Sequence, residues 1–293
     1  MPRTSSDIVL ADGRTLRISE GGDPGGRPVF VLHTCPGSKI LYGEHAADAS
    51  RRGIRLISYD RAGYGGSTPR PGRRVIDEAT DVRAIADSLE IDRFALWGLS
   101  KGGSYALACA AALPDRLVAV ASLAAVAPFP AEGLDWFAGV NEAAVAGFQL
   151  LERDSDAWRR KLSEEAREMA EISEDALRDS LLDSSPDADR AALTPELVSF
   201  ARAQMRDGLS SGPDGFIDDS LSDIRPWGFD LDSITVPVQL WHGMDDRLVP
   251  LSHAKWLGAH LPRAEIRLEP GEGHLSLFAR RIPEVQGWLA DHF

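Results

Sequence analysis

Residues 94–102, with the sequence FALWGLSKG, join an apolar, strand-like run to the small and apolar residues 103–113, which are typical of a buried helix. At the junction, residues 98–102 match the pattern Gly-x-Ser-x-Gly, in which a strained strand-to-helix turn lifts the serine hydroxyl above a sheet. A serine at the start of a helix is often only its cap, so the pattern alone is weak evidence. Its place between a strand-like and a helix-like run makes Ser100 the candidate nucleophile.

Short apolar runs recur on both sides of this turn, and each is separated from the next by enough residues to form a helix. The runs are residues 28–33, 54–59, 94–98, 117–123, 236–241 and 264–268, and the expected helices are 75–89, 100–113, 252–261 and 283–292. This alternation predicts parallel strands joined by right-handed helical crossovers. Residues 7–10 and 15–19 predict an antiparallel hairpin before them. The expected fold is therefore α/β, with a mostly parallel, doubly wound sheet.

The strand pattern disappears between about residues 126 and 232. Charged amphipathic segments take its place at 156–182 and 195–206, the second after Thr194, which is a good helix start before a proline. We expect this part of the chain to be an all-helical cap inserted over one end of the sheet. The expected organisation is thus a core of residues 1–125 and 233–293 with a cap of 126–232, which suits a length of 293 residues.

The charge and composition exclude several classes of partner. The net charge is −13, and residues 131–232 alone, with 24 acidic and 10 basic residues, carry −14 of it against +1 for the rest of the chain. Such a field argues against nucleic acid and anionic membranes as partners. The first 13 residues hold no apolar run suited to a signal peptide, and the longest apolar stretch is too short to span a bilayer, so we expect a cytoplasmic protein. Cys35 and Cys109 form no disulfide framework or zinc spacing, and no metal is expected.

A serine hydroxyl is barely nucleophilic at neutral pH, so it needs an imidazole to take its proton and a carboxylate to orient that imidazole. The ends of two later strands supply both groups. Asp245 and Asp246 follow the fifth apolar run, and His274 follows the sixth. The order Ser, Asp, His is the one found with the Gly-x-Ser-x-Gly turn. His274 is therefore the candidate base, with His242, at the end of a strand, as a weaker alternative.

Acyl transfer also needs two backbone donors for the oxyanion that forms. A helix that begins just after Ser100 offers the N–H of Lys101 as one donor. The other is expected from the turn at residues 33–38, HTCPGS, where Cys35 is chosen because Pro36 has no N–H. The thiol of Cys35 as a nucleophile is a less favoured alternative, because Ser100 is better placed.

These motifs together resemble the α/β-hydrolase family, in the branch of esterases, C–C hydrolases and proline iminopeptidases that carry a helical cap. The resemblance covers residues 28–125 and 235–290, and DRAGYGGS at 60–67 is similar to the family's turn Asp-x-x-Gly-x-Gly-x-Ser. It implies a catalytic triad of Ser100, Asp246 and His274. In the family the acid stands three residues after a glycine and three before a Val-Pro pair, and this spacing selects Asp246 over Asp245. Asp245 is then expected to bond nearby backbone.

Two residues depart from the family's pattern. Thr34 stands where the family usually has glycine, and a β-branched side chain does not readily adopt a positive φ. The oxyanion turn is therefore expected to differ in detail. Lys101 stands where the family commonly has a smaller or uncharged residue, and its side chain is expected to point to solvent.

The expected activity is hydrolysis of an ester, lactone or related small acyl compound through a Ser100 acyl-enzyme, without a cofactor. A haloalkane dehalogenase or epoxide hydrolase of this fold would be expected to carry aspartate in place of Ser100. Two alternatives remain: a proline iminopeptidase-like aminopeptidase, and a ligand-binding protein that keeps the triad but has negligible turnover. Trp136, Phe137 and Phe148 are the candidate walls of the substrate pocket.

Overall fold

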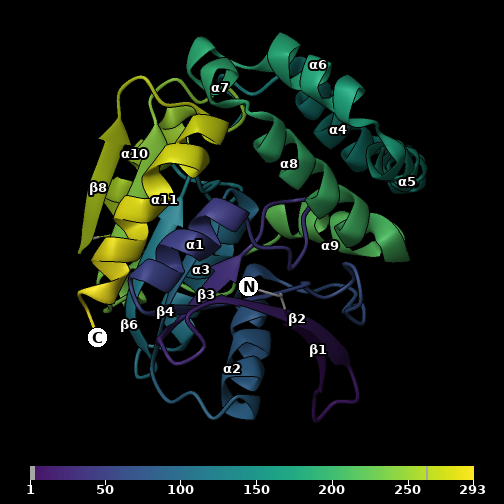
Figure 1. Cartoon of the computed structure of the whole chain (residues 1–293). Helices are drawn as coiled ribbons and strands as arrows, with labels where there is room; N and C mark the ends of the chain where they lie inside the picture. The colour runs from purple at the N-terminus through teal and green to yellow at the C-terminus, as the bar shows by residue number, and fades with distance from the viewer. Residues whose placement is uncertain (1–3, 262) are drawn as a thin grey trace.

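The strands of the protein form one sheet over residues 4–261 and 263–293, the parts of the chain that the computed structural model describes (Figure 1). They are β1 (Thr4–Val9), β2 (Thr15–Gly22), β3 (Arg27–Leu32), β4 (Ile54–Tyr59), β5 (Phe94–Leu99), β6 (Leu117–Leu123), β7 (Val238–Gly243) and β8 (Ala264–Glu269). Their order in the sheet is β1-β2-β4-β3-β5-β6-β7-β8. Only β2 pairs antiparallel, with β1 and with β4, among the pairs of described strands. The expected mostly parallel sheet behind an N-terminal hairpin is confirmed.

Helices cover both faces of the sheet, as a doubly wound fold requires. The helices of the sheet region are α1 (Gly43–Arg51), α2 (Glu78–Ser88) after the 3₁₀ helix η1 (Val75–Asp77), α3 (Lys101–Ala112), α10 (Leu251–His260) and α11 (His274–Ala290). Side chains alternate across each strand, so Phe30 and Leu32 pack with α2, α3 and α10, whereas Val29 and Val31 pack with α1 and α11. Each buried side chain of this size contributes about 1.5–3 kcal/mol of hydrophobic stabilisation.

The chain between β6 and β7 is helical over its described elements. It forms α4 (Glu142–Arg153), α5 (Ser155–Glu171), α6 (Glu174–Ser184), α7 (Asp187–Ala192), α8 (Pro195–Gly208) and α9 (Asp214–Asp223), with the 3₁₀ helices η2 (Leu209–Ser211) and η3 (Leu231–Ser233). We call α4–α9 the cap helices, and Figure 1 shows them grouped at the top and right of the view. The domain boundaries at 125/126 and 232/233 stay a prediction, and residues 1–3 of the expected core lie outside the described residues.

Three expected helices have different bounds in the structure. The segment expected to be one helix over 156–182 is divided, because the side chain of Ser173 accepts the N–H of Ala176 and starts α6. The helix expected over 75–89 begins as the short 3₁₀ helix η1 and continues as the α-helix α2. The last helix begins at His274 and contains Pro283, although a proline inside a helix removes a backbone hydrogen bond. The buried apolar stripe of α11 against the sheet outweighs that loss.

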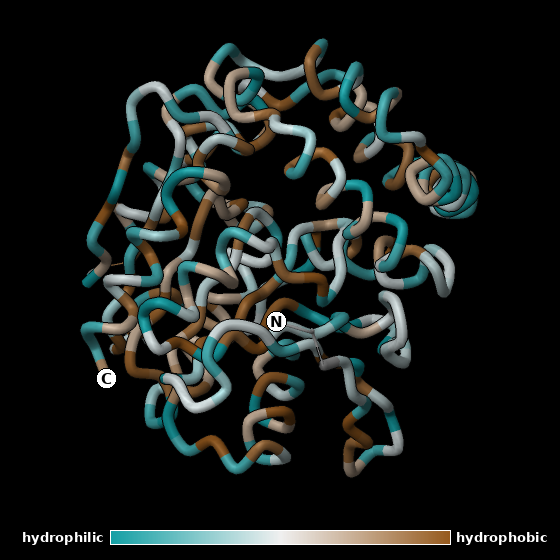
Figure 2. The backbone as a smooth tube through the Cα atoms, in the orientation of Figure 1, coloured by the Kyte–Doolittle hydropathy of each residue, from teal (hydrophilic) through white to brown (hydrophobic). Residues whose placement is uncertain are grey.

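Hydrophilic residues are concentrated on the outside of the cap helices. Figure 2 shows α5, drawn almost end-on at the right, as mostly hydrophilic. Among the described residues, no helix is long and apolar enough to cross a membrane.

Candidate active site

Ser100 occupies a sharp turn between β5 and α3. Its backbone has φ 57° and ψ −123°, a region that costs a non-glycine residue about 1–3 kcal/mol. The turn is held by a hydrogen bond of 2.8 Å from the N–H of Ser100 to the carbonyl of Leu123 at the end of β6. The neighbouring structure therefore holds Ser100 in a strained backbone conformation, at a point that belongs neither to the strand nor to the helix.

The two glycines beside Ser100 are required by close backbone contacts. A Cβ atom on Gly98 would lie 2.1 Å from the carbonyl oxygen of Gly102. A Cβ atom on Gly102 would lie 2.2 Å from the carbonyl oxygen of Leu32, at the end of β3. Contacts this short exclude any side chain. The glycines thus bring the start of α3 against the end of β3, where the next turn begins.

The structure brings the side chains of His274 and Asp246 together, whereas the carboxylate of Asp245 is not hydrogen-bonded to His274. The Nδ1 atom of His274 lies 2.7 Å from Oδ2 of Asp246, and a carboxylate only accepts, so Nδ1 carries the proton. The other oxygen of Asp246 accepts the N–H groups of Leu248 at 2.8 Å and Val249 at 2.9 Å. Asp245 is exposed, and its carboxylate makes none of the expected hydrogen bonds to backbone within the described part of the chain.

The two buried groups shift each other's pKa. Burial alone would lower the pKa of His274, but the charge and hydrogen bond of Asp246 outweigh it, so this pKa lies above its ordinary value. Burial would raise the pKa of Asp246, but His274 outweighs it and the pKa is lowered. His242 lies 3.9 Å from Asp246, it is not among the residues that line the cavity described below, and burial lowers its pKa. Because Nδ1 of His274 carries the proton bonded to Asp246, its Nε2 atom has a free lone pair that can accept a proton.

The turn that holds Cys35 is fixed by the buried side chain of Arg61. Its guanidinium donates to the carbonyl of Thr34 at 3.0 Å and to the carbonyl of His33. His33 is neutral in this arrangement, because its Nδ1–H donates to Thr34 and its Nε2 accepts the N–H of Arg61. In a trans peptide the carbonyl and the following N–H point in opposite directions. The N–H of Cys35 therefore points away from Arg61.

Lys101 departs from the expectation that its side chain points to solvent. It is buried, its ammonium pairs with Asp223 of α9 and lies 5.3 Å from the centre of the Tyr105 ring. A buried ammonium needs such a partner, because desolvation would otherwise disfavour its charge. Its backbone N–H begins α3 and has no acceptor within the helix, so it is available to a ligand.

The thiol of Cys35 is poorly suited to act as a nucleophile. Its Sγ atom lies 3.3 Å from the hydroxyl of Tyr64, and burial raises the pKa of the thiol. The reactive form of cysteine is the thiolate, which a raised pKa disfavours.

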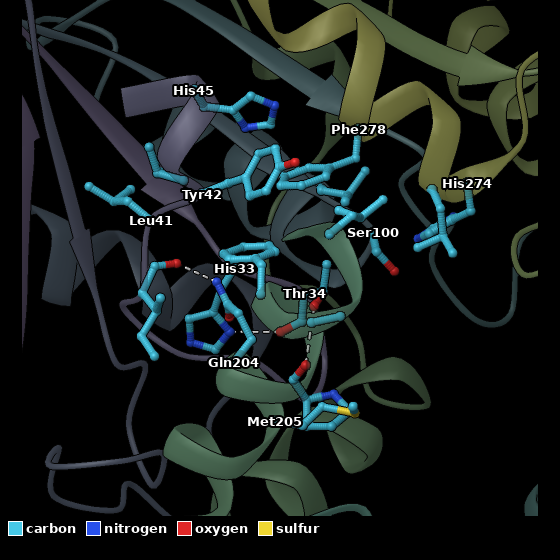
Figure 3. Close-up of a pocket in the computed structure, with 18 of the residues that line it drawn as sticks. His33, Thr34, Leu41, Tyr42, His45, Ser100, Gln204, Met205, His274 and Phe278 are labelled. Atoms are coloured by element: carbon cyan, nitrogen blue, oxygen red, sulfur yellow. Dashed lines mark hydrogen bonds between the residues drawn. The ribbon is translucent and has the colours of Figure 1, made fainter. Parts of the chain in front are cut away.

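Ser100 and His274 line one cavity of about 260 Å³ between the sheet region and the cap helices (Figure 3). Cys35 and Thr34 lie on its wall as well. Its apolar lining from the cap helices and the turn that follows α7 consists of Leu177, Leu181, Leu193, Leu197, Phe200, Ala201 and Met205. None of the residues that line it is Asp, Glu, Lys or Arg. No hydrogen bond of 3.5 Å or shorter joins the Ser100 hydroxyl to His274 in this structure. In many enzymes the nucleophile and the base come within hydrogen-bonding distance only when substrate binds.

Trp136, Phe137 and Phe148 are not among the residues that line this cavity. They pack on one another and on Phe129, with ring centres 5.1–6.3 Å apart, and Trp136 also packs on His253 of α10. Phe148 lines a second cavity of about 340 Å³ among α4, α5 and α9. The expectation that these three aromatic residues line the substrate pocket is not supported, because the loop that carries two of them packs onto α10. On the cap side, the cavity that holds Ser100 is lined by α6, α8 and Leu193 instead.

Two buried carboxylates of the cap helices were not predicted. Asp219 of α9 accepts hydrogen bonds from Arg61 and Arg73, and Asp189 of α7 accepts the N–H of His274 at 3.0 Å. Both contacts join residues far apart in the chain, and no periodic pattern marks either aspartate. Over residues 4–261 and 263–293, no three His, Cys, Asp or Glu side chains are arranged to hold a metal ion.

Comparison with known proteins adds a family match, two similar sequences and one similar solved structure. The family model described as alpha/beta hydrolase fold matches residues 27–280. The chain is 30% identical to the pimeloyl-[acyl-carrier protein] methyl ester esterase of Nitrosomonas europaea over 75% of this chain and 78% of that protein. It is 28% identical to a proline iminopeptidase of Arabidopsis thaliana, over 62% of this chain but only 44% of that protein. A solved thermophilic esterase from Thermogutta terrifontis has the same fold, with a TM-score of 0.69 at 20% identity over 100% of this chain and 99% of that chain.

Proposed function

This chain belongs to the α/β-hydrolase fold family, and we propose that it is a serine hydrolase that cleaves a neutral, largely apolar ester, lactone or related acyl compound. One observation carries the proposal. The strained Ser100 and the His274 that is paired with Asp246 both line the same apolar cavity. A nucleophile, a base and an orienting acid in this order are what acyl transfer requires.

The proposed reaction has two halves. The Nε2 atom of His274 takes the proton of Ser100 as the hydroxyl oxygen attacks the acyl carbon, and the imidazolium then gives that proton to the leaving oxygen. The acyl group remains on Ser100 as an ester. His274 next takes a proton from water, the hydroxide attacks the ester, and Ser100 leaves with its proton restored. In each half the backbone N–H groups of Cys35 and Lys101 bind the oxyanion.

The cavity supports an uncharged, apolar substrate. Transfer of a charged group into such surroundings without a partner costs far more than transfer of an ester, whose two oxygens need few hydrogen bonds. The cavity lining offers no Asp, Glu, Lys or Arg side chain as a partner. The acyl or alcohol part that enters this space is therefore expected to be an alkyl or aryl group.

The same lining weakens the aminopeptidase alternative, although several relatives are named proline iminopeptidases. Recognition of a free amine would need carboxylates at the cavity, and none of its lining residues is Asp or Glu. The ligand-binding alternative differs only in turnover, so it is decided by kinetics.

A substrate panel tests the proposal. We expect p-nitrophenyl esters to be hydrolysed far faster than an aminoacyl arylamide, with lactones in the same panel. Ser100→Ala is expected to lower kcat by about a thousandfold or more while the protein stays folded by circular dichroism. Preference for the arylamide would establish the aminopeptidase alternative. Labelling by a fluorophosphonate without turnover of any ester would establish the ligand-binding one, and Ser100→Ala activity within tenfold of wild type would remove Ser100 as nucleophile.

A further inference from the structure

A carboxylate from a cap helix binds the N-terminus of the helix that carries His274. Asp189 is only 2% exposed, and its two oxygens accept three hydrogen bonds from α11. Oδ2 accepts the N–H of His274 at 3.0 Å, and Oδ1 accepts both the N–H and the hydroxyl of Ser276 at 2.8 Å. An anionic group is favourable there, because the first N–H groups of a helix have no partner within it.

The sequence before α11 is shaped to receive this carboxylate. A Cβ atom on Gly273 would lie 2.5 Å from Oδ1 of Asp189, so only glycine allows the approach. The Ser276 hydroxyl that donates to Asp189 also accepts the N–H of Gly273 at 2.7 Å. The N–H groups of His274 and Ser276 and the Ser276 hydroxyl therefore all donate to one aspartate, which comes from a distant part of the chain.

We propose that Asp189 is a positioning residue for His274. It holds the backbone of His274 in place and stabilises the imidazolium that forms on this residue in each half of the reaction. The inference rests on the proposed function, because it assumes that His274 is the base. Asp189 is not among the residues that line the cavity, so it acts through His274 and not on the substrate.

Several charged or titratable groups surround His274. They are Asp246 on the loop after β7, Asp189 on α7, His242 on β7, and Glu272 before α11, which is bound to Arg280 and Arg281. Asp189 adds to Asp246 in raising the pKa of His274. The reaction needs the neutral imidazole, so activity falls as pH drops through this pKa. Removal of the charge of Asp189 must then lower the pKa and shift the acidic limb of the pH profile to lower pH.

Asp189→Asn tests the proposal against Asp187→Asn, a matched control. Both substitutions remove one negative charge from α7, but Asp187 is fully exposed and, among the described residues, pairs only with Arg190. For Asp189→Asn we expect kcat on a p-nitrophenyl ester to fall by at least about tenfold, since small misplacements of catalytic groups are costly. KM is expected to change less than threefold, and the acidic limb is expected to move to lower pH. Asp187→Asn is expected to stay within twofold of wild type, with its limb unmoved.

A second measurement does not depend on turnover. The ring resonances of His274 are titrated by NMR in wild type and in both variants, and only Asp189→Asn is expected to show a lower midpoint. If wild type hydrolyses no ester, the proposed function fails, while the titration still decides the role of Asp189. Should Asp189→Asn not fold, Asp189→Ser is the second neutral variant for the same titration. A midpoint and a kcat equal to those of Asp187→Asn would overturn the proposal.

Discussion

Asp245 and Asp246 are chemically identical neighbours, and the local turn separates their roles. Oδ1 of Asp246 accepts two N–H groups of its own loop, which leaves Oδ2 aimed at His274, whereas the carboxylate of Asp245 is exposed to solvent. The orientation of one carboxylate is thus set by backbone donors that its neighbour cannot reach.

Asparagine substitutions should show this difference in kinetics. Asp246→Asn is expected to lower kcat by roughly 10⁴, the loss measured in the best-studied triad, because the amide favours the wrong tautomer of His274. Asp245→Asn is expected to cost less than about tenfold, because it removes only an exposed charge. Both are measured on one ester at saturating substrate, with each variant shown to be folded. The opposite ranking would assign the orienting role to Asp245.

The sequence predicted the site residues that lie in turns directly after a strand. Ser100, Asp246 and His274 follow strand ends, and strand ends can be located from apolar runs. Asp189 and the burial of Lys101 could not be located, because each depends on a partner brought from another part of the chain. A charged residue in an amphipathic helix has the same pattern whether it faces water or a buried N–H group.

At the scale of elements, one buried ion network joins α9 to the turn after β4. The carboxylate of Asp219 accepts hydrogen bonds from Arg61 at 2.5 Å, from Tyr105 at 2.7 Å and from Tyr64 at 2.9 Å, and it also binds Arg73. The same Arg61 holds the carbonyls of the turn that contains Cys35. A helix of the cap thereby supports the backbone that is proposed to bind the oxyanion.

Asp219→Asn is expected to lower the free energy of unfolding by about 3–5 kcal/mol, because two buried guanidinium groups lose their charged partner. Asp214→Asn, at the exposed start of the same helix, is expected to change it by less than about 1 kcal/mol. Urea unfolding followed by circular dichroism measures both. Equal losses in the two variants would show that the network contributes no more than an exposed charge.

Elements with a clear pattern of apolar residues could be predicted from the sequence. Element ends that depend on a single cap, or on packing that opposes local propensity, could not. The strands β3 to β7 were located because they are buried apolar runs, as is typical of a parallel sheet. The break between α5 and α6 depends on one serine cap, and the early start of α11 depends on buried apolar contacts that outweigh Pro283. Local propensity predicts the opposite in the second case.

At the scale of the whole molecule, the cavity lies between two layers, and both contribute aromatic walls. Phe200 of α8 stacks on Phe278 of α11, with ring centres 5.6 Å apart and planes 8° from parallel. Both residues line the cavity that holds Ser100. The width of this cavity is therefore set where the cap helices meet the sheet region.

Phe200→Ala is expected to shift the preferred p-nitrophenyl ester toward longer acyl chains, because it removes a ring from the cavity wall. Phe137→Leu is the control from the aromatic cluster outside this cavity, and it is expected to leave the chain-length profile unchanged. The profile of kcat/KM against chain length measures both. A profile altered by Phe137→Leu and not by Phe200→Ala would place the substrate beside the aromatic cluster of Trp136, Phe137 and Phe148 and not beside Phe200.

The contacts of Asp189 and Asp219 also bear on how freely the cap can be exchanged. Each aspartate sits in the segment between β6 and β7, yet each satisfies groups that belong to the rest of the fold. A chimera that replaced this segment with the corresponding one of another hydrolase would transfer a new pocket and at the same time remove the acceptors for the His274 N–H and for Arg61. We therefore expect a chimera to fold and remain active only when the new segment places carboxylates at those two positions. The segment between β6 and β7 cannot be exchanged independently of the rest of the fold.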